Sequence, residues 1–305
     1  MWTILAVGLA GVGFGLAAEG MWPMSEVGRL DLRDRGLRID PAQIYNPEGI
    51  SLVDGICKID GCTGSFVSPE GLILTNHHCA YGAVQAASTK ERNLLEDGFL
   101  AKARTGEIPA KNFTIRITES YRDVSGEVLG VLQPGMQPAE RTKAIERRTK
   151  EIILEAEKQL PGKRAEVAEM FPGKTYVLFV YTYLKDVRLV YVPPLSVGNF
   201  GGDADNWVWP RHTADFSFLR AYVGPDGSPA VYSENNVPYQ PRKYLQVAPE
   251  GVNEGDFIFI FGYPGTTYRH RTSHYLDFES RLRMPWVADW YEWQIRLMDG
   301  LGAED

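Results

Sequence analysis

The stretch CTGSFVSPEGLILTNHHC, at residues 62–79, constrains the fold of this chain more than any other. Two short apolar runs flank SPEG at 68–71, and Pro and Gly at such positions are typical of a tight turn, so we predict a β-hairpin. His78 follows the end of the second strand. An imidazole there can accept the proton of a serine hydroxyl and return it to a leaving amine. The alternative is a buried histidine that is hydrogen-bonded in a core.

Cys62 and Cys79 begin and end this hairpin. A disulfide between them would close a loop of fewer than twenty residues and contribute about 3 kcal/mol, which would fix the strand end that carries His78. The alternative is that all three cysteines of the chain are unpaired, buried thiols. If the disulfide forms, Cys57 is left over, either free or paired outside the chain.

Asp215 directly precedes a strand-like run in which Phe216 and Phe218 alternate with polar residues. An aspartate held at the rim of a sheet can accept the Nδ1 proton of a catalytic histidine, so we pair Asp215 with His78. An ordinary turn aspartate at a strand edge is the alternative.

The composition limits the classes of partner. The 305 residues are 44% hydrophobic and 11% aromatic, enough for one large core or two modest ones. A formal charge of -7 argues against nucleic acid and anionic membrane surfaces as partners, because an acidic protein attracts neither. Small molecules and peptides remain open as partners.

Residues 1–18 resemble a secretory signal peptide. An uncharged apolar run, too short for a membrane span, ends in the small residues Leu16-Ala17-Ala18 before Glu19. Because a positively charged start is missing, a short core helix or a misassigned start codon is the alternative. Export to the periplasm or cell surface would suit the disulfide.

Strands dominate the rest of the chain. A charged, Gly/Pro-containing leader at 21–50 precedes strand-like segments up to about Leu132, and the charged segment at 138–173 is predicted to form one long and one short helix. Strand character returns at 175–194.

The last third of the chain contains one more expected strand. GDFIFIFGYPG, at 255–265, is predicted to be a buried strand with a turn at 262–265, and the pattern becomes helical and tryptophan-rich from about Tyr275. The expected class is therefore mainly β with a helical insertion at about 138–172.

A serine nucleophile for His78 is missing from the motifs of the chain. Such a serine needs a tight turn that exposes its hydroxyl and aims backbone N–H groups at the oxyanion, as in GxSG, and no such motif occurs. Ser228, in PDGSPA, belongs to a turn pattern, and Ser65 and Ser217 lie inside strand patterns.

The chain resembles the bacterial dipeptidyl peptidases of serine peptidase family 46. Four motifs in order carry the resemblance: GMW at 20–22, CTGSFVSPEGLILTNHHCAYGAVQ at 62–85, GGDADNWVWPRHTADFSFLRAY at 201–222 and GDFIFIFGYPG at 255–265.

The resemblance implies a chymotrypsin-like double β-barrel interrupted by an α-helical domain. Residues 19–274 would then hold the first barrel and the start of the second, and residues 275–305 the beginning of the helical domain. The family's nucleophilic serine, oxyanion-hole amides and specificity residue would lie after that domain, so the chain is expected to be an inactive N-terminal fragment.

The resemblance also implies roles for single residues. His78 would be the general base, Asp215 would orient it, and Asn206 and Trp207 would bind the free α-amine of a peptide substrate. An amide oxygen and backbone carbonyls are suitable acceptors for an ammonium group. Without the family, Asn206 and Trp207 are better explained as a turn-capping amide and a core indole. The resemblance also suggests a homodimer. We expect no metal or other cofactor.

Two other functions remain as alternatives. The first is a secreted, non-catalytic peptide-binding protein on a protease scaffold, suggested by the missing serine. The second is a metal hydrolase, suggested by His270 and His274 at i, i+4 spacing and by the neighbouring His77, His78 and Cys79. HRTSH lacks the glutamate of the zinc-hydrolase motif, which disfavours the second.

Overall fold

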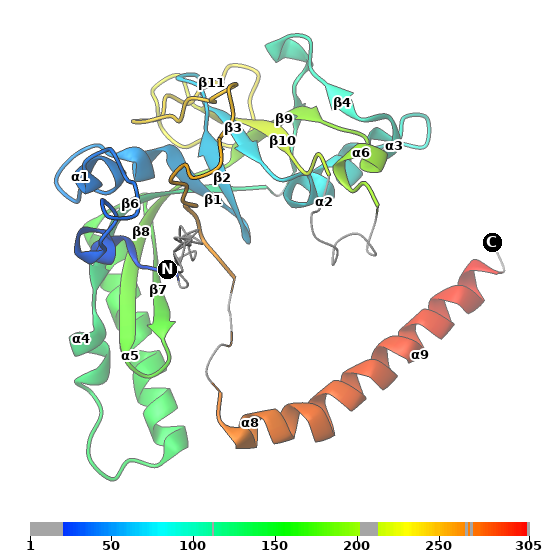
Figure 1. Cartoon of the computed structure of the whole chain (residues 1–305). Coiled ribbons are helices and arrows are strands. Elements are labelled where there is room, and N and C mark those ends of the chain that lie inside the picture. The colour runs from blue at the N-terminus through cyan, green and yellow to red at the C-terminus, as the bar shows by residue number, and fades with distance from the viewer. Residues whose placement is uncertain (1–20, 112, 202–212, 266–267, 269–270, 304–305) are drawn as a thin grey trace, which may run out of the picture. The chain divides into compact units, whose positions relative to one another are not determined.

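The structure, a computed structural model, describes residues 21–111, 113–201, 213–265, 268 and 271–303. The chain divides into two compact units, Met1–Tyr263 and Pro264–Asp305. Within the described part of the first unit, eleven strands form one antiparallel sheet with the order β4-β9-β10-β3-β2-β1-β6-β8-β7, and β11 and β5 pair with β10 and β9 (Figure 1).

The strands are β1 (Ile56–Ile59), β2 (Cys62–Phe66), β3 (Leu72–Thr75), β4 (Phe99–Leu100), β5 (Ile108–Pro109), β6 (Ile115–Asp123), β7 (Arg164–Phe171), β8 (Thr175–Leu184), β9 (Asp186–Val192), β10 (Ser217–Val223) and β11 (Val237–Pro238). The described helices of the first unit are η1 (Met24–Arg29), α1 (Pro41–Ile44), η2 (Leu52–Gly55), α2 (His77–Ala87), α3 (Leu94–Asp97), η3 (Arg104–Gly106), α4 (Ser125–Leu129), α5 (Pro138–Gln159) and α6 (Leu195–Gly198).

The main core lies where α2 packs on the central strands. Ala80, Ala83 and Val84 of α2 share one buried cluster with strand residues such as Phe66 and Leu219. Because side chains alternate along a strand, the inward residues of β2, β3 and β10 fill this core while the strand ends remain at its edge. The N-terminus of α2 therefore lies at the rim of a rigid sheet.

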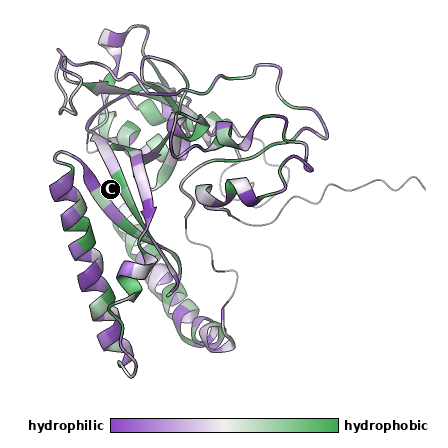
Figure 2. Ribbon diagram, turned by 90° about the vertical axis from the view of Figure 1, so that its left-hand side faces the viewer, coloured by the Kyte–Doolittle hydropathy of each residue, from purple (hydrophilic) through white to green (hydrophobic). Residues whose placement is uncertain are grey.

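Helix α5 begins as predicted, with Pro138 in its first turn, but the predicted short helix after it is wrong. Pro161 and Gly162 end the helical pattern, Gly162 having a φ of 84°. The following segment forms β7, which pairs with β8 and contributes Val167 to a second core beneath α5. The backbone ladder and this burial outweigh the local helical pattern. The hydrophilic residues along α5 are visible in Figure 2.

The expected mainly β class with helices is confirmed, but a closed barrel is not observed. Closure requires the first and last strands of a sheet to pair. Among the described residues, β4 and β7 end an open path.

The predicted buried strand at 255–265 is also wrong. This stretch, all of it described, has no strand, and Ile258 and Ile260 are 70% and 96% exposed. An apolar run becomes a buried strand only if a neighbouring strand pairs with it. Instead, the end of the segment is held by the Tyr263 backbone N–H, which donates to Thr63 Oγ1 at 2.9 Å, and by a 2.6 Å contact between Tyr263 Oη and Thr118 Oγ1.

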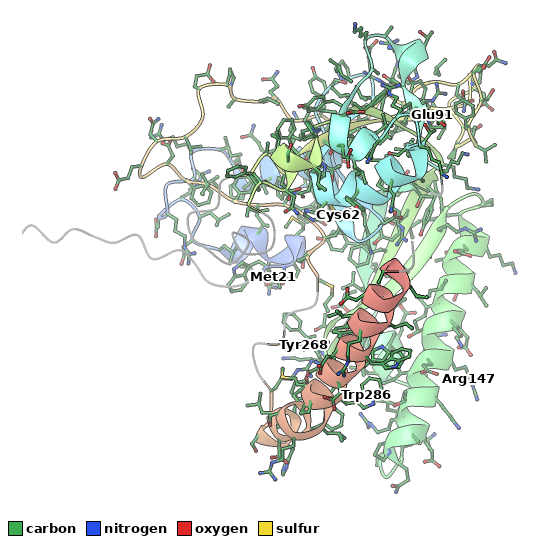
Figure 3. The ribbon with its side chains drawn as sticks, turned by 90° about the vertical axis from the view of Figure 1, so that its right-hand side faces the viewer. Met21, Cys62, Glu91, Arg147, Tyr268 and Trp286 are labelled. Atoms are coloured by element: carbon green, nitrogen blue, oxygen red, sulfur yellow. A yellow bond between two sulfur atoms is a disulfide. The ribbon has the colours of Figure 1, made fainter. Side chains whose placement is uncertain are left out.

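The second unit is helical, as predicted. It contains α8 (Ser273–Phe278), one π-helical segment η4 (Glu279–Arg283) and α9 (Met284–Gly302). Trp286 of α9 is 63% exposed and stacks on Trp290 with ring centroids 6.1 Å apart (Figure 3). No described helix of either unit combines the length and the apolar character that a membrane crossing requires.

Candidate active site

The register of β10 against β3 brings the candidate residues together. Ser217 lies opposite Thr75 in this antiparallel pair. The residues before Ser217 therefore run alongside those after Thr75, where the chain turns from β3 into α2. As a result, Asp215 meets the first turn of α2, although it is 137 positions from His78 in the sequence.

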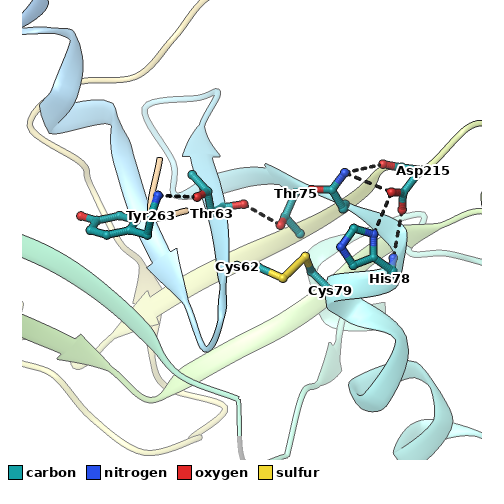
Figure 4. The surroundings of a disulfide bond; sticks show 8 residues. Cys62, Thr63, Thr75, His78, Cys79, Asp215 and Tyr263 are labelled. Carbon is teal, nitrogen blue, oxygen red and sulfur yellow. Dashed lines mark hydrogen bonds and ion pairs between the residues drawn. A yellow bond between two sulfur atoms is a disulfide. The ribbon is translucent and has the colours of Figure 1, made fainter. Parts of the chain in front are cut away.

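The disulfide that the hairpin suggested is present. Cys62, at the start of β2, is bonded to Cys79, in the first turn of α2, with Cα atoms 6.2 Å apart. Thr75 Oγ1 also donates to the Thr63 carbonyl at 2.9 Å (Figure 4). These two links fix the end of β3 and the start of α2. Cys57 is the leftover cysteine, free and buried, and burial raises the pKa of its thiol.

His78 and Asp215 form a hydrogen-bonded pair. His78 Nδ1 lies 2.7 Å from Asp215 Oδ2, and the His78 backbone N–H donates to Asp215 Oδ1 at 3.0 Å (Figure 4). The His78 side chain is 69% exposed, whereas that of Asp215 is 18% exposed. The carboxylate is thus held in the protein, and the imidazole that it orients is accessible from solvent.

Asp215 is stabilised as a carboxylate. Burial raises its pKa, but hydrogen bonds from the backbone and side chain of His78, and one from Asn76, outweigh burial and leave the pKa below its ordinary value. Its position at the N-terminus of α2 acts in the same direction, because a helix N-terminus favours a negative charge. Asp215 can therefore balance the positive charge that a neighbouring imidazolium acquires.

Asn76 is a site residue that sequence analysis missed. Its Nδ2 donates to the Asp215 carbonyl at 3.1 Å and to Asp215 Oδ2 at 3.2 Å. The only local signal was an asparagine before a helix, which indicates a helix cap and not a contact with a residue 139 positions away.

His77 is buried under the same turn, with 1% of its surface exposed. Burial lowers the pKa of His77, and Asp215 and the Pro193 carbonyl only partly oppose this effect. A Cβ atom on Gly198 would lie 2.5 Å from His77 Cδ2, so only glycine fits against the ring. His77 is therefore a neutral packing group between α2 and α6, in contrast to the exposed His78.

Comparison with known proteins identifies the family of the chain. Residues 17–305 match the model of the peptidase S46 family. The chain belongs to peptidase family S46. It is 43% identical over 292 residues to dipeptidyl-peptidase 7 of Capnocytophaga gingivalis, covering 94% of this chain and 40% of that relative. It is 40% identical over 269 residues to the Asp/Glu-specific dipeptidyl-peptidase of Porphyromonas gingivalis, covering 86% of this chain and 37% of that relative.

Solved structures of DPP11 also match the fold of the chain. The crystal structure of Porphyromonas endodontalis DPP11 in complex with the dipeptide Arg-Asp matches this S46 chain with a TM-score of 0.78 and 40% identity, over 85% of this chain and 38% of that one. A complex of the same protein with Arg-Glu gives a TM-score of 0.76. The chain thus spans less than half the length of the relatives that it matches.

Most of the other residues named in the sequence predictions cannot be compared with the site. Asn206, Trp207 and His270 fall outside the described residues, as does the expected signal peptide at 1–18. His274 lies in α8 of the second unit.

Within the part of the chain that the structure describes, one cluster has the composition of a metal ligand set. Among the described residues, ligand atoms of Cys62, His78 and Cys79 lie within 4.8 Å of one another. The two sulfur atoms are bonded to each other, however, so neither is a thiolate that could bind a metal. This cluster gives the metal-hydrolase alternative no support.

Proposed function

We propose that this chain supplies the histidine and aspartate of a serine dipeptidyl peptidase that releases dipeptides from peptides with a free N-terminus. The observation that carries the proposal is the 2.7 Å contact between His78 Nδ1 and Asp215 Oδ2, made by an imidazole that remains exposed. Family membership, and the dipeptides in the matching DPP11 structures, support the substrate class.

The geometry suits a general base. When Nδ1–H is donated to Asp215, the lone pair lies on Nε2, which can accept the proton of a serine hydroxyl as its oxygen attacks the peptide carbonyl. The imidazolium then gives that proton to the leaving amine as the C–N bond breaks, which leaves an acyl-enzyme. Water then attacks the acyl-enzyme carbonyl and gives a proton to Nε2. The imidazolium returns that proton to the serine oxygen as the ester bond breaks, which releases the dipeptide. Throughout, the Asp215 carboxylate balances the charge on the ring.

We assign the nucleophilic serine and its oxyanion hole to residues outside this sequence. Ser65 and Ser217 lie within β2 and β10, and Ser228 is tied into a turn by donating to Asp226 Oδ1 at 2.7 Å. Ser65 and Ser217 are thus held inside strands, and the hydroxyl of Ser228, although exposed, is engaged by Asp226; none of the three stands in the GxSG turn of a serine nucleophile. The 305 residues alone are then expected to be inactive.

Further parts of the proposal concern the whole protein. We propose that Asn206 and Trp207 bind the substrate α-amine, that residues 1–18 direct export to the periplasm or cell surface, and that the open sheet is part of a chymotrypsin-like double barrel interrupted by a helical domain. The disulfide between Cys62 and Cys79 supports export, since such bonds persist in oxidising compartments.

The test uses the complete protein encoded by the reading frame that contains these residues. We expect release of dipeptides from peptides with a free N-terminus, none from N-acetylated peptides, and inactivation by a serine-directed acylating reagent. His78→Ala should lower kcat on the order of a million-fold. His274→Ala, a histidine in the second unit, is the matched control and should retain activity.

The same experiment distinguishes the alternatives. Equal cleavage of blocked and free peptides would exclude an exopeptidase. Loss of activity with a chelator, or in His274→Ala, would favour the metal hydrolase. Binding of peptides without turnover by the complete protein would favour the peptide-binding protein, which the missing GxSG motif suggests.

A further inference from the structure

The helix cap of α2 is built in an unusual way. Asn76 occupies the N-cap position, where an asparagine oxygen normally accepts a hydrogen bond from a backbone N–H of the first turn. No such bond forms at Asn76. The backbone N–H of His78, in the first turn, instead donates to Asp215 Oδ1, so a carboxylate from the segment just before β10 takes over the cap.

Asn76 contacts Asp215 twice. Its Nδ2 donates to the backbone carbonyl of Asp215 at 3.1 Å and to carboxylate oxygen Oδ2 at 3.2 Å. Oδ2 is the same oxygen that His78 Nδ1 approaches to 2.7 Å. One amide group therefore links the main chain of Asp215 to the oxygen that orients the imidazole.

We propose that Asn76 is a positioning residue that fixes the rotation of the Asp215 carboxylate and, through it, the tautomer and ring orientation of His78. The inference rests on the proposed function for its effect on catalysis. Without Asn76, the carboxylate would be held at Oδ1 by the His78 backbone N–H and at Oδ2 only by the imidazole that it has to orient, so the two groups could rotate together. The second anchor at Oδ2 stops that rotation and keeps Oδ2 in line with Nδ1–H.

The substitution Asn76→Asp distinguishes a positioning role for Asn76 from a purely structural one. Aspartate caps helices as well as asparagine does. If Asn76 served the helix alone, Asn76→Asp would be neutral or stabilising. If Asn76 positions Asp215, Asn76→Asp removes the donor and sets a second carboxylate near 3.2 Å from Oδ2, where like charges repel.

The first measurement is the 15N spectrum of labelled histidine, with the His78 signals assigned through His78→Ala. We expect His78 to be a single Nδ1–H tautomer in the wild-type protein, and a mixture in Asn76→Ala and Asn76→Asp. Asn93→Ala is the matched control, because Asn93 caps α3 by accepting from the Leu95 N–H and has no bond to Asp215. It should leave the His78 signals unchanged.

The second measurement is turnover by the complete protein. We expect kcat to fall roughly 10- to 100-fold in Asn76→Asp with KM little changed, as for small misplacements of a catalytic group. A single Nδ1–H tautomer in both Asn76 variants would overturn the proposal, whether or not the protein is a peptidase. Absence of turnover in the wild-type protein would instead overturn the proposed function and leave the tautomer result to decide the role of Asn76.

Discussion

Removing the disulfide should destabilise the protein without altering its fold. In the double variant Cys62→Ala/Cys79→Ala, the link between the start of β2 and the first turn of α2 is lost. The β2–β3 ladder and the bond from Thr75 Oγ1 to the Thr63 carbonyl remain. Because both cysteines are only partly buried, the lost packing is small and the effect lies mainly in the unfolded chain.

The magnitude follows from the length of the closed loop. The two cysteines are 17 positions apart. The chain-entropy relation gives about 3 kcal/mol for a loop of this size at 25 °C. That is a large fraction of the roughly 5–15 kcal/mol by which folded domains are stable. The variant is therefore expected to unfold at a clearly lower denaturant concentration.

The assay is equilibrium unfolding of the 305-residue chain in urea under oxidising conditions. Unfolding is followed by tryptophan fluorescence and by circular dichroism. Wild-type protein with a phosphine reductant is the internal control and should move to the stability of the double variant. The variant itself should not respond to the reductant. Thiol titration of the unfolded 305-residue wild-type chain should find one free thiol, since two of its three cysteines are bonded.

Equal unfolding midpoints for the double variant and the oxidised wild type would refute this reasoning. A response of the variant to the reductant would refute it too, because the remaining Cys57 is free and has no bond to reduce.

Three further predictions concern other parts of the structure. The pKa of Asp215 lies below its ordinary 3.8, so the stability that Asp215 contributes is fully present above 3.8 and is lost as the pH falls from there through the lower pKa of the folded state. In acid unfolding, the wild type should lose stability relative to Asp215→Asn over this range, and a difference that stayed constant would contradict the prediction. Gly198→Ala should cost about 1–3 kcal/mol in urea unfolding, because the new Cβ lies 2.5 Å from the His77 ring; an unchanged midpoint would contradict that packing. Glu107→Ala should cost about 3–5 kcal/mol by the same assay, because it leaves Arg220, now 2.9 Å from the carboxylate, nearly buried without its partner; a cost below 1 kcal/mol would show that the pair contributes little.

Local signals in the sequence were sufficient for several elements. The turn residues at 68–71 predicted the hairpin of β2 and β3, and dense Val, Tyr, Phe and Leu predicted β8 and β9. Pro138 and the charged periodic run predicted α5. In each case the pattern that decides the structure lies within the element itself.

Contacts between distant segments decided the rest. The residues of β7 carry a helical composition, yet they form a strand because β8 offers them a ladder and a core. The apolar run at 255–265 reads as a strand, yet no described neighbour pairs with it. A backbone segment takes the hydrogen-bonding partners that tertiary structure provides, and single-segment patterns do not contain that information.

The candidate site, too, has features that the local sequence predicts and features that only contacts between distant segments decide. By itself the sequence was sufficient to predict that His78 pairs with Asp215 and that Cys62 bonds to Cys79, because motifs and cysteine spacing mark residue types at characteristic positions. Only the tertiary structure showed that Asn76 turns away from its own helix to hold Asp215. An asparagine before a helix has the same local sequence pattern whether its side chain caps that helix or bonds to a residue of a distant segment. The register of β10 against β3 places Asp215 within reach of its amide, and that register is a property of two strands far apart in the chain.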